Sequence, residues 1–156
     1  MGYDDEMSTL YRDAFNEVIE QLLPRVHQMG IRILELEAGH VRASAPFDGN
    51  TNHLGTMYAG TLFALAEVLG GALIAPSFDL SEVYPVVKDL QIKFRRPARG
   101  DVTAACSLDA ETIEQLRTEV QAKGKAQFVL TVEIIDTENE LVVTTEGTYQ
   151  LRRHGG

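Results

Sequence analysis

Residues 52–76 read NHLGTMYAGTLFALAEVLGGALIAP, and this stretch decides the fold. From Met57 to Pro76 it holds a single charged residue, Glu67, near the middle. Apolar residues occupy every side of the stretch, which predicts a helix over roughly residues 58–75 that is covered all round. A carboxylate in such a helix is costly to bury, and burial raises its pKa toward the range useful for acid–base chemistry. Glu67 is therefore the first candidate for a functional residue.

The same stretch is just long enough to span a bilayer. Its central carboxylate, the lack of flanking Lys or Arg and the absence of a second such segment argue against that interpretation. A sheet wrapped around an apolar helix accounts for the pattern better, so we expect no membrane partner.

The composition limits the class of protein. A length of 156 residues, 44% of them hydrophobic, suits a single folded domain over residues 1–156. The net charge of −9 argues against a nucleic-acid partner, because phosphate attraction needs a basic surface. Cys106 is the one cysteine, which fits a reducing compartment, and we expect it to be a small core residue. The acidic start, MGYDDEM, is unlike a signal peptide, so we expect a cytoplasmic protein.

The N-terminal region is predicted to be helical. Residues 8–23 place apolar side chains at amphipathic-helix spacing, with Ser8 or Thr9 as the cap. Pro24 either ends this helix or begins a short following turn, and the helical unit then runs over residues 8–28.

Alternating or β-branched runs predict six strands, and they form the core of the domain over residues 30–152 together with the long helix. The runs are 31–36, 41–47, 90–94, 102–108, 128–134 and 141–151. Residues 110–123 have helical composition, and Gly124 is a good helix stop. The alternation indicates an antiparallel sheet with one covered face, so the fold class is α+β, a curved sheet around a long central helix.

This order of elements, together with NHLGTMYAGTLFALAE, resembles the hotdog fold of the acyl-CoA thioesterase superfamily, and most closely its PaaI-like branch. Asn52 stands at the asparagine of the family motif, and Leu65-Ala66-Glu67 stand at its acidic triplet. Residues 92–98 resemble the family strand that ends in Arg-Pro. By motif the resemblance covers residues 52–71 and 92–98.

Two residues depart from the family motif, because Tyr58-Ala59-Gly60 stand where the family has His-Gly-Gly. The resemblance implies a histidine that positions the thioester, and here Tyr58 takes its place. Tyr58 could donate a hydrogen bond to the substrate carbonyl, or its ring could pack into the core.

The start of the long helix is a candidate oxyanion hole. The amides of Ala59 and Gly60 would be free there, and the helix dipole favours negative charge. Gly60 and Glu67 are seven residues apart, or about 10 Å along a helix, too far for both to reach one carbonyl carbon. A second, antiparallel copy of the helix would bring Glu67 of one subunit near Gly60 of the other. We therefore expect a homo-oligomer, a dimer or a dimer of dimers, with composite sites.

Several residues share a helical stripe with Glu67, and the small ones would let another backbone or a ligand come close to it. They are Gly60, Phe63, Ala64, Gly70 and Gly71. Phe63 and Gly71 are the candidates for substrate contacts. The alternative is plain helix packing, with Glu67 paired to a cation or a backbone amide.

Asn52, just before the helix, would orient water or the carboxylate, as its motif position implies. The alternative is a capping or turn asparagine. His53 has no motif support and is interpreted as a surface residue, and the other histidines are scattered, so no metal site is expected.

Lys93, Arg95, Arg96 and Arg99 form a dense basic cluster in an acidic protein. Lys93, Arg95 and Arg96 are candidates for the phosphates of coenzyme A, which Arg binds well. Strand alternation places Lys93 and Arg95 on one face and Arg96 on the other, so they cannot all bind one phosphate. A solvated strand face is the alternative interpretation.

These observations favour an acyl-CoA thioesterase in which Glu67 acts as general base or as nucleophile. No cofactor is expected, since coenzyme A enters as part of the substrate. A non-catalytic acyl-CoA or fatty-acyl binding protein, and a hotdog dehydratase or hydratase, are the alternatives. The dehydratase chemistry needs an acid–base partner, usually histidine, and Tyr58 at that position weighs against it.

Overall fold

A computed structural model describes residues 2–155. Four helices and six strands follow one another along the described chain. In order they are α1 (Tyr3–Leu22), α2 (Pro24–Gln28), β1 (Arg32–Glu37), β2 (His40–Ala45), α3 (Ala59–Ile74), β3 (Val83–Phe94), β4 (Val102–Ser107), α4 (Ala110–Lys123), β5 (Lys125–Ile135) and β6 (Leu141–Arg153).

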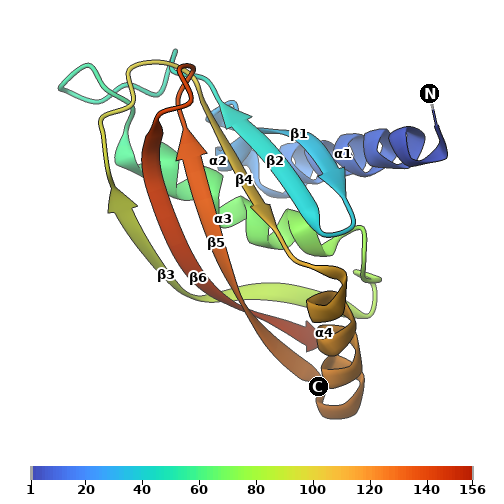
Figure 1. The fold of residues 1–156 in the computed structure, drawn as a ribbon. Helices are drawn as coiled ribbons and strands as arrows, with labels where there is room; N and C mark the ends of the chain where they lie inside the picture. Colours follow the sequence, from blue (N-terminus) through green and yellow to red (C-terminus); the bar gives the residue numbers. More distant parts are fainter. Residues whose placement is uncertain (1, 156) are drawn as a thin grey trace.

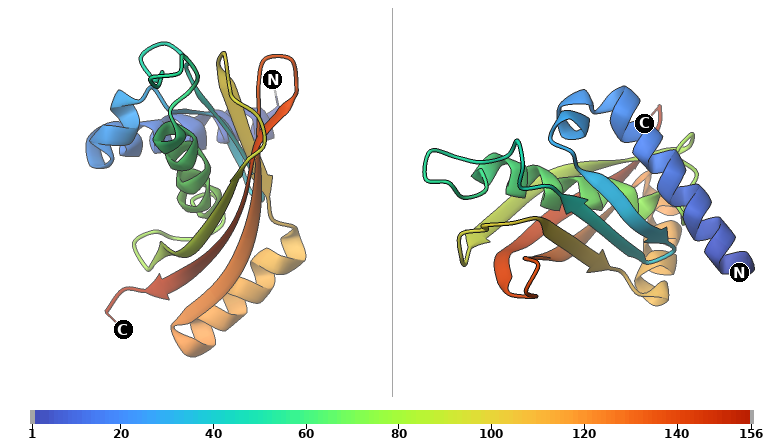
Figure 2. Two further views of the ribbon diagram at one scale, coloured as in Figure 1. Left: turned by 90° about the vertical axis from the view of Figure 1, so that its left-hand side faces the viewer. Right: turned by 90° about the horizontal axis from the view of Figure 1, so that it is seen from above.

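The six strands form one antiparallel sheet in the order β1-β2-β4-β5-β6-β3 (Figure 1). The sheet curves around α3, which lies against its concave face, while α4 lies on the opposite side of the sheet (Figure 2). Helix α1 packs against β1 at the other end of the sheet from β3. The expected α+β class, hotdog fold and central helix are confirmed.

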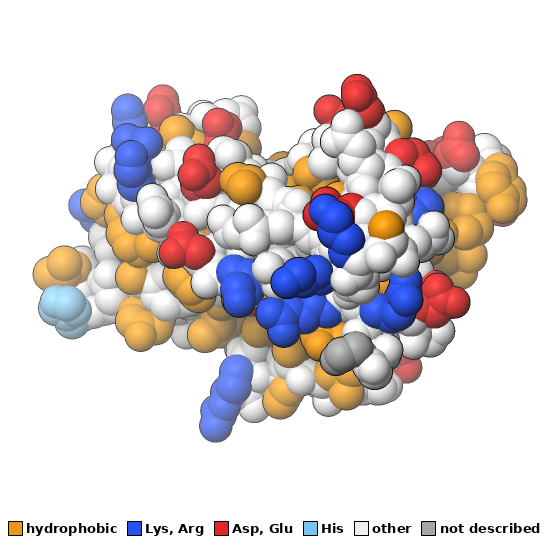
Figure 3. Space-filling model, turned by 90° about the horizontal axis from the view of Figure 1, so that it is seen from below, with side chains coloured by type: hydrophobic (Ala, Val, Ile, Leu, Met, Phe, Trp, Pro, Cys, Tyr) orange, Lys and Arg blue, Asp and Glu red, His pale blue; other side chains and the backbone are white. Residues whose placement is uncertain are grey.

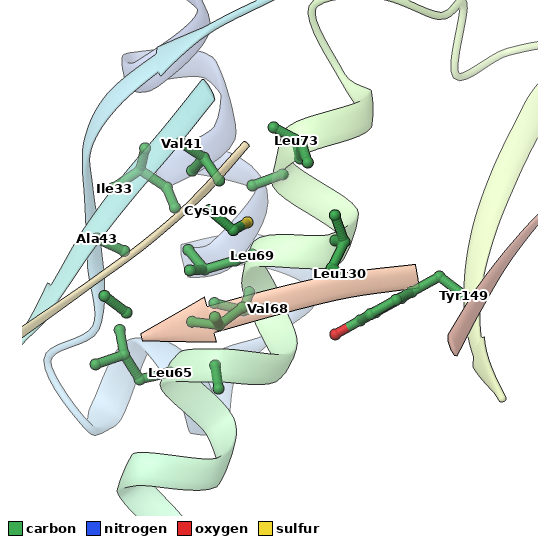
Figure 4. Close-up of a cluster of buried hydrophobic side chains, with 14 of the residues drawn as sticks. Ile33, Val41, Ala43, Leu65, Val68, Leu69, Leu73, Cys106, Leu130 and Tyr149 are labelled. Carbon is green, nitrogen blue, oxygen red and sulfur yellow. The ribbon is translucent and has the colours of Figure 1, made fainter. Parts of the chain in front are cut away.

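Strand alternation builds the core, because every second side chain of a strand points to the same face. In β5 the buried positions alternate strictly with exposed ones. On α3, Leu65, Leu69 and Leu73 are almost fully buried and meet the inward side chains of the sheet (Figure 4). Cys106 of β4 is 6% exposed in this core, as expected, and burial raises the pKa of its thiol to about 12.

The N-terminal helix begins earlier than the sequence predicts. Its N-cap is Gly2, so Ser8 and Thr9 lie inside α1 and the prediction that either caps it is wrong. The first turn carries three acidic residues, whose charges are favourable near the positive end of the helix dipole. Pro24 begins the separate helix α2 at its first position.

Strand β3 is longer than the alternating run at residues 90–94, because it begins at Val83. It contains Pro85, which lacks a backbone N–H. A proline is tolerated there because β3 is an edge strand, paired with β6 on one side. Further along, Gly124 ends α4 in the left-handed conformation, with φ of 75°, as the sequence predicts.

Coverage of α3 is less complete than predicted. The sheet buries one side of the helix, but Phe63 remains 41% exposed and Tyr58, the N-cap residue, 54% exposed. The cause is geometric, since a single sheet can wrap only part of a cylinder. One stripe of an apolar helix is therefore left uncovered within residues 2–155. No helix in this part of the chain combines the length and apolar character needed to cross a membrane.

Candidate functional site

The first turn of α3 leaves two backbone donors free. Tyr58 N donates to Asn50 O over 2.8 Å, which places the N-cap. The amides of Thr61 and Leu62 both donate to Tyr58 O, at 3.1 and 3.3 Å. Within residues 2–155 the amides of Ala59 and Gly60 have no hydrogen-bond acceptor. Two adjacent unpaired N–H groups at a helix N-terminus suit a negatively charged oxygen.

Asn50 anchors this helix tip and was not singled out by the sequence, where it is part of an Asp-Gly-Asn loop. Its side chain is 7% exposed. Nδ2 donates to Met29 O at 2.7 Å and to Pro46 O at 2.8 Å, and Oδ1 accepts from the Thr61 hydroxyl at 3.1 Å. The end of α2, the end of β2 and the start of α3 are thereby joined through one buried amide.

Tyr58 lies over Gly60. A Cβ at position 60 would overlap the Tyr58 ring, so a glycine is needed there for the ring to come this close to the helix backbone. The ring is more than half exposed, and the interpretation that it packs into the core is therefore wrong. Its ring instead lies against Gly60, at the start of α3.

Glu67 lies two turns further along α3, and its side chain is half-buried. Within residues 2–155 its carboxylate forms no hydrogen bond or ion pair, which argues against the alternative of a paired structural glutamate. Burial raises the pKa of Glu67, since the charged form loses hydration without gaining a partner. A carboxylate of this kind is suited to accepting a proton near neutral pH.

A cavity of about 300 Å³ opens at the tip of α3. Loop, helix and strand residues line it: Asn52, Thr56, Met57, Ala59, Leu62, Phe94, Arg95, Arg96, Pro97 and Ala98. Four predicted site residues are thus brought together, namely Asn52, Ala59, Arg95 and Arg96. Glu67, Phe63, Gly71 and Lys93 do not line this cavity. Within one chain, the Glu67 carboxylate therefore lies outside the cavity at the helix tip, as the spacing along the helix predicts.

The amide of Asn52 is occupied within its own loop. Nδ2 donates to Thr56 Oγ1 at 2.9 Å and, less favourably, to Met57 O at 3.4 Å. Oδ1 accepts from the backbone amides of Leu54 and Thr56, at 2.9 and 3.1 Å. These bonds are those of a turn asparagine, and the role of orienting water stays a prediction.

The basic cluster divides between the two faces of the sheet. Arg95 Nε donates to Thr144 Oγ1 at 3.2 Å, and Lys93 and Arg95 line a second cavity of about 300 Å³ on the face away from α3. Arg96 instead pairs with Glu140 at 3.2 Å. Lys and Arg side chains gather on the underside of the molecule (Figure 3).

The two glycines near the end of the predicted stripe differ in their surroundings. Gly70 is buried beneath the ring of Tyr149 from β6, so its expected place on the ligand-facing stripe is wrong. Gly71 is half-buried, and a Cβ there would meet nothing closer than 3.9 Å.

Within residues 2–155 no group of three or more metal-ligating side chains occurs.

The curved sheet around α3, with a lone acid on that helix, defines a protein of the hotdog thioesterase superfamily. The family model of a domain of unknown function, DUF4442, matches residues 12–151, so the chain belongs to that family. A structure from Pseudomonas aeruginosa, of a protein of unknown function described as a probable thioesterase, is 44% identical, with a TM-score of 0.84 and coverage of 94% of this chain and 95% of that chain.

More distant structures share the fold. A protein of unknown function from Chlorobaculum tepidum is 22% identical, with a TM-score of 0.81 and 97% of each chain covered. A thioesterase from Haemophilus influenzae is 20% identical, with a TM-score of 0.73, covering 93% of this chain and 94% of that chain. At such identities the similarity concerns the arrangement of helices and strands.

Proposed function

We propose that this protein hydrolyses a small-molecule thioester of the acyl-CoA type, with Glu67 as the reactive carboxylate. The observation that carries the proposal is the state of that side chain, which is half-buried, unpaired and raised in pKa by burial on an otherwise apolar helix. Such a group is costly to retain without a use. The similarity to a probable thioesterase at 44% identity supports the same reaction class.

In the proposed reaction Glu67 accepts a proton from water as the water oxygen attacks the carbonyl carbon. The carbonyl π electrons move to the oxygen, and the amides of Ala59 and Gly60 stabilise the resulting oxyanion. Collapse of this intermediate re-forms the C=O bond and breaks the C–S bond. The leaving thiolate takes the proton from Glu67, which restores the carboxylate. Direct attack by Glu67 on the carbonyl is the alternative route to the same products.

The carboxylate and the amides would act on one carbonyl only across two subunits. The uncovered stripe of α3 and the free edge of β3 supply a surface for a second copy, since Phe63, Val87 and Phe94 are each 41–53% exposed. A two-fold axis through this surface would place each Glu67 near the partner's helix tip and create two equal sites. Tyr58, beside the tip, would donate a hydrogen bond to the substrate carbonyl.

Arg95 and Arg96 are the better candidates for the coenzyme A phosphates, because both line the cavity beside Ala59. Lys93 belongs to the opposite face of β3 and would reach only a group that extends there. Phe63 and Gly71, on the uncovered stripe, would contact the acyl part of the substrate.

The test is release of free thiol from short-chain, long-chain and aryl acyl-CoAs, with the wild-type protein beside Glu67→Gln. We expect turnover by the wild type and a loss of at least about 100-fold in kcat in the variant, with the oligomer still folded. Glu20→Gln, at an exposed glutamate of α1, is the matched control and should retain full activity. Full activity of Glu67→Gln would refute the assignment. Tight binding of an acyl-CoA without turnover would instead support the non-catalytic alternative.

A further inference from the structure

Tyr149 of β6 is the largest polar side chain of the core, and no step described so far uses it. Its side chain is 2% exposed, and its ring stacks on Phe128 of β5 with centroids 5.6 Å apart. The ring projects from the sheet with its hydroxyl directed at α3 (Figure 4). The hydroxyl donates to Glu67 O over 3.4 Å. Within residues 2–155 this is the one buried phenol, and it contacts the residue that carries the candidate reactive group.

Two glycines fix the place of this ring. A Cβ on Gly147 would lie 2.7 Å from Tyr149 Cε2, and a Cβ on Gly70 would overlap the opposite edge of the ring. The phenol is therefore held between helix and sheet, with little freedom to tilt. Rigid packing of this kind determines where a hydroxyl group points.

The hydroxyl keeps its proton in this environment and can donate it to a hydrogen bond. Burial, and then the negative charges of Glu67 and Cys106, raise the pKa of Tyr149 beyond its ordinary value, so the phenol stays protonated. The bond to Glu67 O is long for an O–H···O hydrogen bond, and within residues 2–155 it is the one hydrogen bond of this hydroxyl.

We propose that Tyr149 is a positioning residue for Glu67, because its hydroxyl binds the backbone carbonyl of Glu67 and so fixes the α3 turn from which the carboxylate projects. This inference rests on the proposed function for its catalytic consequence. The Tyr149 hydroxyl reaches Glu67 O from β6, and no cation in residues 2–155 pairs with the Glu67 carboxylate.

The test replaces Tyr149 by Phe, which keeps the ring between its glycines and removes only the hydroxyl. We expect kcat to fall about tenfold with KM little changed, because the α3 turn that carries the carboxylate is held less firmly while substrate binding is unaffected. Tyr11→Phe, at a half-buried tyrosine of α1, is the matched control and should change neither quantity. A wild-type kcat in Tyr149→Phe would overturn the proposal.

A second readout does not depend on turnover. The backbone carbonyl carbon of Glu67, labelled with ¹³C, reports by NMR the hydrogen bond that its oxygen accepts. We expect its chemical shift to move in Tyr149→Phe and to stay unchanged in Tyr11→Phe, and an unchanged shift in Tyr149→Phe would refute the positioning role. Failure of the wild type to hydrolyse any thioester, with this shift present, would refute the proposed function and leave the Tyr149–Glu67 relationship standing.

Discussion

The Thr61 hydroxyl donates to Asn50 Oδ1 over 3.1 Å, and this bond ties the first turn of α3 to the loop that precedes it. The same asparagine holds Met29 O and Pro46 O through its Nδ2. The free amides of the helix tip depend on this arrangement, because the helix start is fixed by Asn50 and not by a side-chain cap of its own.

Asn50→Ala should therefore destabilise the protein by about 2–3 kcal/mol, because two partly buried carbonyls and one buried hydroxyl lose their partner. Urea unfolding measures the change. Thr61→Val, which removes only the bond to Asn50 Oδ1, is the graded control and should cost about 1 kcal/mol. A smaller loss in Asn50→Ala than in Thr61→Val would contradict the anchoring role.

Gly70→Ala should destabilise the fold by about 1–3 kcal/mol or more, because the new methyl group overlaps the ring of Tyr149. Gly71→Ala is the matched control on the next residue of the same helix. A Cβ at position 71 would meet nothing closer than Pro85 Cγ at 3.9 Å, so this variant should be neutral or gain up to about 1 kcal/mol of helix stability. Thermal or urea unfolding compares them, and equal effects of the two substitutions would be evidence against the close approach of helix and sheet.

The fold could be predicted because its signals are local. The apolar run around Glu67 predicts α3, and strict alternation predicts the strands. Both patterns depend on near neighbours in the sequence and not on how helix and sheet pack together. The sequence predicts the start of α1 too far along the chain. Ser8 and Thr9 are residues that often cap a helix, but here they lie inside α1, which begins at Tyr3. The first half of β3 was missed because Pro85 weakens the alternating pattern, which an edge strand tolerates.

The candidate site was only partly predictable for a different reason. Glu67, Ala59 and Gly60 share one helix, so their spacing follows from the sequence. Asn50 and Tyr149 act through contacts between distant segments, and the hydroxyl of Tyr149 reaches a residue 82 positions away in the chain. Contacts of this kind leave no periodic pattern or motif in the sequence. They form only when the distant segments come together in the folded chain.

The raised pKa of Glu67 should make stability depend on pH in a definite direction. Burial raises the folded-state pKa above the unfolded one, so the folded protein holds this proton more tightly and loses stability as pH rises through that window. Glu67→Gln cannot ionise, and it should be more stable than the wild type at neutral pH, with the advantage vanishing below about pH 4. Urea unfolding from pH 4 to 8 measures the difference.

Glu20→Gln is the control for this pH series, because Glu20 is exposed and its removal should bring no gain that grows with pH. A stability advantage of Glu67→Gln that stays constant across the range would show that burial of the carboxylate does not perturb its ionisation. The same titration should give the activity its acidic limb, since a protonated Glu67 cannot accept a proton from water.

Phe63→Arg tests whether the uncovered stripe of α3 is the face that meets a second copy. Phe63 is 41% exposed on this stripe, so a cation there should be tolerated by the monomer fold but should disfavour a contact between two apolar helices. We expect sedimentation velocity to show a shift toward monomer, with thioester hydrolysis lost in parallel because each site needs residues from both subunits. Val129→Arg makes the same change at a 54% exposed valine of β5 and should leave at least a dimer and its activity. A monomeric Phe63→Arg protein with full activity would show that Glu67 and the helix tip do not need a partner.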